Sequence, residues 1–220
     1  MSPQTAVRKE GAARIVTASA TLEGDLVIPD GATGIVLFAH GSGSSRFSSR
    51  NRFVARALQE GKLGTLLIDL LTSDEEKIDE RTTHLRFDID LLAERLVGSS
   101  DWLGTQPETR DLRIGLFGAS TGGGAALVAA AQRPDRISAV VSRGGRPDLA
   151  GAALPRVTAP TLLVVGGNDG AVIEMNREAY DQMRCERRLE IVAGATHLFE
   201  ERGALETVAR LARDWFTRFL

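Results

Sequence analysis

The chain has 220 residues, of which 43% are hydrophobic and 25% are charged, and its formal net charge at pH 7 is −2. This length fits a single globular domain over residues 1–220, and the apolar fraction is large enough for a substantial core. The nearly balanced charge excludes the basic surface of a nucleic-acid-binding protein.

The same composition bears on the cellular compartment. The first ten residues lack the apolar core of a signal peptide, and no apolar run approaches the length of a membrane span. The single cysteine, Cys185, excludes an intramolecular disulfide and fits a reducing environment. We therefore expect a cytoplasmic protein that contacts neither membrane nor nucleic acid.

The first predicted elements are two strands, Ala13–Ser19 and Thr21–Ile28, with a bend at Glu23-Gly24-Asp25 inside the hairpin. Gly34–Ala39 is apolar throughout, which is typical of a strand buried on both faces of a parallel sheet. A helix follows, and the strand Thr65–Asp69 comes after it. That helix is predicted from the spacing of Phe53, Val54, Ala57 and Leu58, and from the closing glycines Gly61 and Gly64.

The segment 70–83 is acidic and irregular, and Ser73 with Glu76 offers a capping box for one short helical turn. An amphipathic helix is predicted from Leu85 to about Leu103, and Pro107 bars its extension.

Strands and helices alternate in the second half. The predicted strands are Ile114–Ala119, Ile137–Ser142, Thr161–Val165 and Leu189–Val192, and the predicted helices are Gly122–Gln132, Val172–Met183 and an apolar stripe from Leu205 to Phe219. This order predicts an α/β fold with a doubly wound, mostly parallel sheet, antiparallel N-terminal strands and helices on both faces.

The most informative stretch is Gly118-Ala-Ser-Thr-Gly122, which lies between a predicted strand and a predicted helix. This is the context that a G-x-S-x-G motif needs to form a nucleophile elbow, a sharp turn that presents its serine at the end of a sheet. Glycine at 118 and 122 relieves the crowding in such a turn. Ser120 is therefore the candidate nucleophile.

A serine hydroxyl needs a base and an orienting acid to become nucleophilic. Asp169 and His197 each follow a predicted strand, and parallel strands place such residues along one edge of the sheet. The order Ser120, Asp169, His197 is the order of an α/β-hydrolase. We expect His197 to act as the base and Asp169 to orient its imidazole.

Charge on a tetrahedral intermediate requires backbone donors. The N–H of Thr121, at the start of the helix after the elbow, is one candidate. The second is expected from the glycine-rich loop at residues 40–45, where Ser42 is favoured and Gly43 and Ser44 are alternatives. His40 is interpreted as a residue that shapes this loop through hydrogen bonds.

Two arginines follow the strand Ile137–Ser142. Arg143 and Arg146 are candidate ligands for a carboxylate or phosphate on a substrate, because guanidinium binds such groups with two hydrogen bonds. The alternative, slightly favoured, is that they pair with Asp148 or with the acidic segment Asp74–Glu80.

These motifs resemble the α/β-hydrolase superfamily and, within it, the dienelactone hydrolase-like group of small hydrolases. The resemblance covers nearly the whole chain and includes His40–Ser45, Gly118–Gly122, Gly167–Asp169 and the run from Gly194 through His197. Dienelactone hydrolase itself uses a cysteine nucleophile, whereas this chain has Ser120, so the resemblance implies the fold and a hydrolytic reaction but not lactone specificity. The segment Gly144–Pro160 is too short for a large cap, which favours an open site for small esters.

Three other functions are compatible with parts of the sequence. Gly41-Ser-Gly43, followed by Asp69 at the next strand end, imitates a dinucleotide-binding loop, although Arg46 replaces its third glycine. A hydrolase fold that only binds a small ligand or a partner protein, and a perhydrolase with the same triad, are the other two. No metal or cofactor is implied, because the three histidines lack ligand spacing. The expected partner is a small-molecule ester, and both a monomer and a homodimer are compatible with the sequence.

Overall fold

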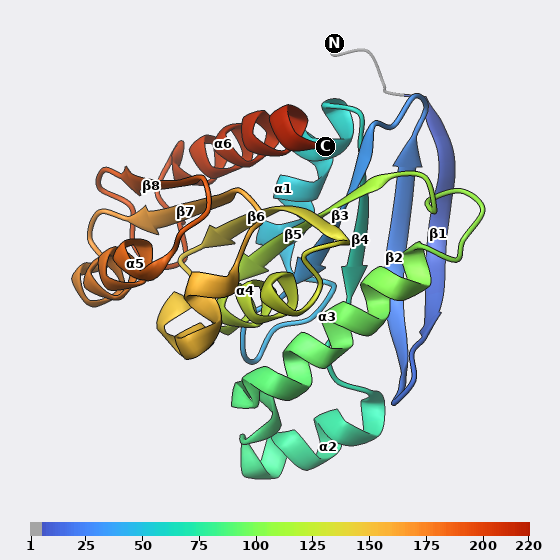
Figure 1. Ribbon diagram of the computed structural model, residues 1–220, viewed down its shortest axis with the longest axis horizontal. Coiled ribbons are helices and arrows are strands. Elements are labelled where there is room, and N and C mark those ends of the chain that lie inside the picture. Colours follow the sequence, from blue (N-terminus) through green and yellow to red (C-terminus); the bar gives the residue numbers. More distant parts are fainter. Residues whose placement is uncertain (1–5) are drawn as a thin grey trace.

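The structure is a computed structural model that describes residues 6–220 (Figure 1). Its strands are β1 (Val7–Val16), β2 (Thr21–Pro29), β3 (Gly34–Ala39), β4 (Leu63–Ile68), β5 (Arg113–Ala119), β6 (Ile137–Arg143), β7 (Thr161–Gly166) and β8 (Arg187–Val192). Its α-helices are α1 (Ser49–Glu60), α2 (Ser73–Thr82), α3 (Ile89–Leu103), α4 (Thr121–Gln132), α5 (Gly170–Gln182) and α6 (Ala204–Phe219). Two 3-10 segments, η1 (Leu85–Phe87) and η2 (Pro147–Arg156), complete the described elements.

Within residues 6–220 the strands form one eight-stranded sheet in the order β1-β2-β4-β3-β5-β6-β7-β8. β2 pairs antiparallel with β1 and β4, and every later pairing is parallel. The predicted fold class is confirmed. The parallel strands bring the carboxyl ends of β3, β5, β6 and β7 to one edge, where the loops that follow them meet.

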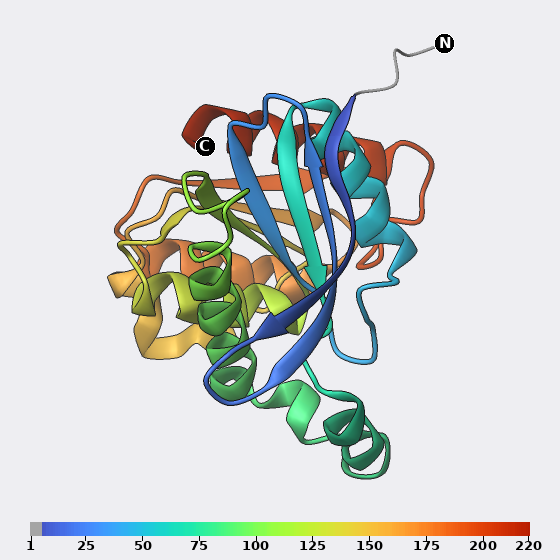
Figure 2. The ribbon, with the colours of Figure 1, turned by 90° about the vertical axis from the view of Figure 1, so that its right-hand side faces the viewer.

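Helices cover both faces of the sheet, α1 and α6 on one and α3, α4 and α5 on the other (Figures 1 and 2). All six residues of β3 are buried, as expected for a strand between two helical layers. Phe216 of α6 is fully buried, and a Cβ atom at Gly115 of β5 would lie 2.6 Å from its ring. The terminal helix therefore packs closely on its own sheet, as its apolar stripe predicts.

The N-terminal hairpin differs from the prediction. β1 begins at Val7, and β2 runs straight through Gly24, so the predicted bend is wrong. The turn lies at residues 17–20 instead, where Thr17 N–H donates to the carbonyl of Ala20 at 2.9 Å. The reason for glycine at 24 is close packing, because a Cβ atom there would lie 2.8 Å from Ile15 Cδ1.

The acidic segment after β4 is a ten-residue helix, α2, and not one turn. Its capping box uses Thr72 and Glu75, one residue earlier than predicted. Acidic side chains fill its first turn and interact favourably with the helix dipole, which stabilises a segment that looks irregular by its hydrophobic pattern. Figure 2 shows α2 standing out beyond the start of α3.

Two further boundaries differ from the sequence prediction. α3 begins at Ile89, since Asp88 caps it by accepting from Leu91 N–H at 3.0 Å, and Leu85–Phe87 forms a separate 3-10 turn. The loop after β6 contains η2, which is broken at Gly151 with φ 45°. η2 packs on α4, where a Cβ atom at Gly124 would lie 2.7 Å from the carbonyl oxygen of Arg146.

The prediction that the N-terminus lacks the apolar core of a signal peptide concerns the first ten residues. Residues 1–5 of this segment lie outside the described residues. Across residues 6–220, every helix is too short or too polar to cross a bilayer.

Candidate active site

Ser120 lies in a strained turn between β5 and α4. Its backbone has φ 50° and ψ −122°, a conformation that residues other than glycine rarely adopt. The turn is tight because a Cβ atom at Gly118 would lie 2.4 Å from the carbonyl oxygen of Gly122, and one at Gly122 would lie 2.4 Å from the carbonyl oxygen of Ala39. The structure thus has the strand–turn–helix geometry of a nucleophile elbow.

Asp169 and His197 form a hydrogen-bonded pair. The Asp169 Oδ2 and His197 Nδ1 atoms are 2.6 Å apart. A proton on Nδ1 is donated to the carboxylate, and the neutral imidazole then has Nε2 free to accept a proton. Asp169 is the first residue before α5, but its side chain makes no capping bond to that helix, so the carboxylate is available to the imidazole.

Backbone contacts hold the two loops that carry this pair. Asn168 N–H donates to the carbonyl of Ala195 at 2.9 Å, and the Asn168 side-chain amide donates to the carbonyl of Gly194 at 2.9 Å. A Cβ atom at Gly166 would lie 2.5 Å from the carbonyl oxygens of Ala195 and Thr196, so the end of β7 and the His197 loop are in direct contact. This contact explains how residues 28 positions apart in sequence meet.

Ser120 and His197 line one cavity of about 260 Å³, together with Ser42 and Arg143. Across the described residues, no hydrogen bond joins the Ser120 hydroxyl to the imidazole. Catalytic hydrogen bonds often shorten only when substrate binds, so a shared cavity is compatible with proton transfer between the two groups.

The Thr121 side chain has a role that the sequence did not reveal. Ser42 N–H, the favoured second oxyanion donor, donates to Thr121 Oγ1 at 3.0 Å. Ser44 N–H is also engaged, because it donates to the carbonyl of Gly41 at 3.2 Å. The threonine hydroxyl links the loop after β3 to the start of α4, so the Ser42 amide already has a hydrogen-bond acceptor in this structure.

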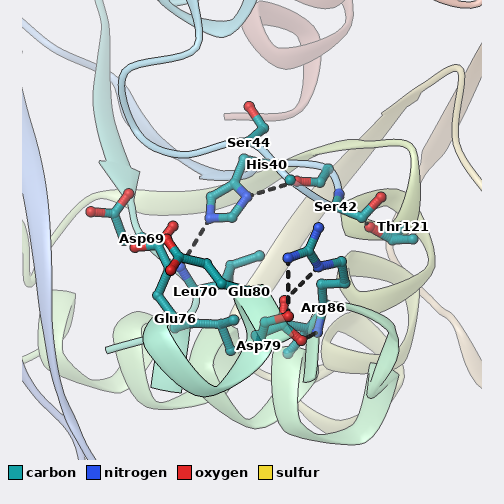
Figure 3. Close-up of a pocket in the computed structure, with 14 residues that line it drawn as sticks. His40, Ser42, Ser44, Asp69, Leu70, Glu76, Asp79, Glu80, Arg86 and Thr121 are labelled. Carbon is teal, nitrogen blue, oxygen red and sulfur yellow. Dashed lines mark hydrogen bonds and ion pairs between the residues drawn. The ribbon is translucent and has the colours of Figure 1, made fainter. Parts of the chain in front are cut away.

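His40 fixes the same loop from its other side, which confirms its interpretation as a loop-shaping residue (Figure 3). Its Nδ1 lies 2.9 Å from the carbonyl oxygen of Gly41, and its Nε2 accepts from Leu70 N–H at 3.1 Å. These two bonds require a neutral ring with the proton on Nδ1. Burial lowers the pKa of His40 from its usual 6.5 and outweighs the raising effect of the Gly41 carbonyl.

The lowered pKa of His40 predicts that acid destabilises the fold. In the unfolded chain His40 becomes protonated as the pH falls below about 6.5, whereas in the folded chain its lowered pKa keeps it neutral to lower pH. The full contribution of His40 to the free energy of unfolding is therefore present above pH 6.5 and is lost as the pH falls below it. We expect His40→Gln to lose less free energy of unfolding than the wild type between about pH 7.5 and about pH 5. Urea unfolding at both pH values measures this difference. His84→Gln, at an exposed histidine, is the control, and an equal loss in wild type and His40→Gln would refute the assignment.

A narrow second cavity of about 50 Å³ lies between the loop after β3 and α2 (Figure 3). Asp79 of α2 forms one of its walls, and this buried carboxylate accepts hydrogen bonds from Arg86 N–H at 3.1 Å and Arg86 Nε at 2.5 Å. The guanidinium and amide of Arg86 lower the pKa of Asp79 despite its burial. Arg86, which Asp79 anchors, thus lies against the loop after β3, with its Nη1 3.5 Å from where a Cβ atom at Gly43 would lie.

The two candidate substrate-binding arginines have different surroundings. Arg146 pairs with Asp148 through two hydrogen bonds of 2.9 Å and 2.7 Å, the alternative considered for it above. Arg143 is buried beside Ser120 and lines the same cavity. The structure thus brings Arg143, but not Arg146, to the candidate site.

The acidic residue that dinucleotide binding would require is already hydrogen-bonded within the protein. Asp69, which would bind a ribose, accepts hydrogen bonds from the backbone and the guanidinium of Arg46. Arg46 thus holds the loop before α1.

The fold, the elbow and the Asp–His pair are those of an α/β-hydrolase. Residues 69–220 match a family model described as PET hydrolase-like (PETase). A crystal structure of dienelactone hydrolase from Anabaena variabilis is 63% identical, covers 96% of this chain and 98% of that chain, and superposes with a TM-score of 0.95. The chain therefore belongs to the PET hydrolase-like α/β-hydrolases and is a dienelactone hydrolase-like member of that superfamily.

Two further relatives are informative, one about the fold and the other about chain length. Est1E from Butyrivibrio proteoclasticus is 18% identical, with a TM-score of 0.78 over 94% of this chain and 98% of that chain, and so supports the fold alone. A curated Mycobacterium tuberculosis protein, provisionally named a phosphoribosyl transferase, is 54% identical over 203 residues, which are 92% of this chain and 45% of that protein. The chain thus spans about half the length of the curated relatives that it matches.

Proposed function

We propose that this chain is a serine hydrolase that cleaves small carboxylic esters, lactones or thioesters through an acyl-enzyme on Ser120. One observation carries the proposal. The hydroxyl of a strained elbow serine shares a cavity with an imidazole whose other nitrogen lies 2.6 Å from a carboxylate.

In the proposed reaction, His197 Nε2 accepts the Ser120 proton while Oγ attacks the carbonyl carbon of the ester. Asp169 stabilises the imidazolium that forms. The imidazolium then returns the proton to the leaving alcohol as the carbon–oxygen bond breaks, which leaves an acyl group on Ser120. Water activated by the same imidazole releases the acid and restores the serine.

The proposed oxyanion donors are the N–H groups of Thr121 and Ser42. Thr121 is the first residue of α4, where backbone N–H groups lack partners within the helix and the helix dipole favours negative charge. Each such donor is worth about 3 kcal/mol of transition-state stabilisation. Ser42 contributes only after Thr121 Oγ1 releases its amide, so substrate binding and the rotation of this hydroxyl are coupled.

We do not extend the transferase activity in the name of the curated relatives to this chain, because the match covers only 45% of those proteins. The elbow geometry of this chain supports acyl transfer to water instead. We also propose that the chain functions in the cytoplasm with a small ester as its ligand.

Release of 4-nitrophenol from a series of short and medium-chain p-nitrophenyl esters tests the function. We expect measurable turnover, and mass spectrometry of quenched reactions should show one added acyl group on the intact protein and, after digestion, place it on the peptide that contains Ser120. Turnover without such an adduct, combined with full activity of Ser120→Ala, would contradict the proposal. Adding peroxide tests the perhydrolase alternative, since only a perhydrolase would form peracid in preference to acid.

A further inference from the structure

Arg143 is a buried cation without a counterion in the part of the chain that the structure describes. The side chain lies at the end of β6, and only 7% of the residue is exposed. Among the described residues, its guanidinium takes part in no hydrogen bond or ion pair, and its Nε atom is buried without a partner. Its guanidinium carbon lies over the ring of Phe199, 5.8 Å from the ring centroid, in a cation–π contact. A buried charge that is not paired lowers stability, which makes a purely structural role unfavourable.

The charge of Arg143 persists at neutral pH. Burial and the nearby Arg50 cation lower its pKa to about 10, which still leaves the guanidinium protonated. Arg143 is positioned next to the nucleophile, because Ser120 N–H donates to the Arg143 carbonyl at 3.3 Å and the two side chains line the same cavity.

The rest of the cavity lining suits an anion as well. Arg50 lines it, and so do Ser48 and Asn51 at the N-terminus of α1, where the helix dipole favours an anion. No carboxylate lies among the described residues that line it. Arg50 already has a partner, Glu200, at 3.2 Å. One positive charge, that of Arg143, therefore remains uncompensated beside Ser120.

We propose that Arg143 is the anion-binding residue of the substrate pocket, and that the preferred ester carries a singly charged anionic group such as a carboxylate. A monoanion balances the one unpaired cation, and guanidinium binds a carboxylate with two parallel hydrogen bonds. The substrate then supplies the counterion that the fold lacks. This inference rests on the proposed ester hydrolysis and specifies its substrate class.

Matched pairs of esters test the charge preference. Mono-p-nitrophenyl glutarate carries a carboxylate on its acyl part, and p-nitrophenyl pentanoate is its neutral match. 3-Acetoxybenzoate carries the carboxylate on its alcohol part, and 3-tolyl acetate is its neutral match. We expect wild type to favour the anionic member of at least one pair, and Arg143→Gln to lower that ratio of kcat/KM at least tenfold, mainly through KM. Arg143→Lys should retain part of the preference.

Arg146→Gln is the matched control, since Arg146 pairs with Asp148 outside the cavity. An unchanged ratio in Arg143→Gln, or an equal fall in Arg146→Gln, would overturn the assignment. Arg143→Met adds a readout without catalysis. Because it removes a buried unpaired charge, we expect its Tm to equal or exceed that of wild type, and a marked fall in Tm would indicate a structural role instead.

A binding experiment separates this inference from the proposed function. Calorimetric titration of the Ser120→Ala protein with monomethyl glutarate and with dimethyl glutarate measures recognition without turnover. We expect the monoanion to bind more tightly, and Arg143→Gln to abolish the difference. If no ester is hydrolysed but this difference exists, the function is wrong and the anion site is right. If esters are hydrolysed and both compounds bind equally, the anion site is wrong.

Discussion

Ser120→Ala is expected to lower kcat/KM for a short p-nitrophenyl ester by at least about 10⁴-fold, since loss of the nucleophile in a serine triad leaves only the contribution of binding and the oxyanion donors. Alanine tolerates the φ of 50° at this position about as well as serine, so we expect the fold to persist. Steady-state kinetics of the purified variant, with a thermal unfolding curve for each protein, measure the effect.

Ser44→Ala is the matched control for that experiment. Ser44 lines the same cavity, and alanine retains its backbone N–H. The control should keep activity within about threefold, because the partly buried Ser44 hydroxyl lies outside the proton-transfer chain and contributes little. Equal losses in the two variants would show that the cavity tolerates no change, and the special role of Ser120 would then be unsupported.

Asp169→Asn is expected to lower kcat by about 10⁴-fold, as the corresponding change does in other serine triads. An amide in place of the carboxylate favours the imidazole tautomer with its proton on Nε2, and that tautomer cannot accept a proton from Ser120. Because the Asp169 side chain does not cap α5, we expect little change in stability. Kinetics and urea unfolding together measure both effects.

Asp181→Asn makes the same chemical change at an exposed position near the end of α5. It should leave kcat unchanged within about twofold. Activity of Asp169→Asn within tenfold of wild type would mean that the contact of 2.6 Å with His197 does not set the tautomer during the reaction.

The sequence predicts those parts of the site that depend on local pattern and on strand order. The elbow is readable because glycines flank Ser120 between a strand and a helix, and the structure shows the crowding that requires them. The sequence predicts that Asp169 and His197 lie together, because each follows a parallel strand and parallel strands end at one edge. Their hydrogen bond shows that the two side chains meet at this edge.

Other features depend on contacts that no local pattern encodes. α2 lacks an apolar stripe, and its stability comes from caps and from the Asp79–Arg86 interaction across a loop. The bond between Ser42 and Thr121 joins residues 79 positions apart. The two arginines after β6 look equivalent in sequence, and only tertiary packing pairs Arg146 with Asp148 while leaving Arg143 unpaired beside Ser120.

Covalent labelling with a fluorophosphonate probe tests the central claim most directly, because the probe reacts with a serine only when a neighbouring base activates it. Tryptic mass spectrometry of the labelled protein should locate the adduct on Ser120, with labelling lost in Ser120→Ala and at least tenfold slower in His197→Ala. A protein that binds short esters yet stays unlabelled, or that labels equally fast without the imidazole, would contradict the account.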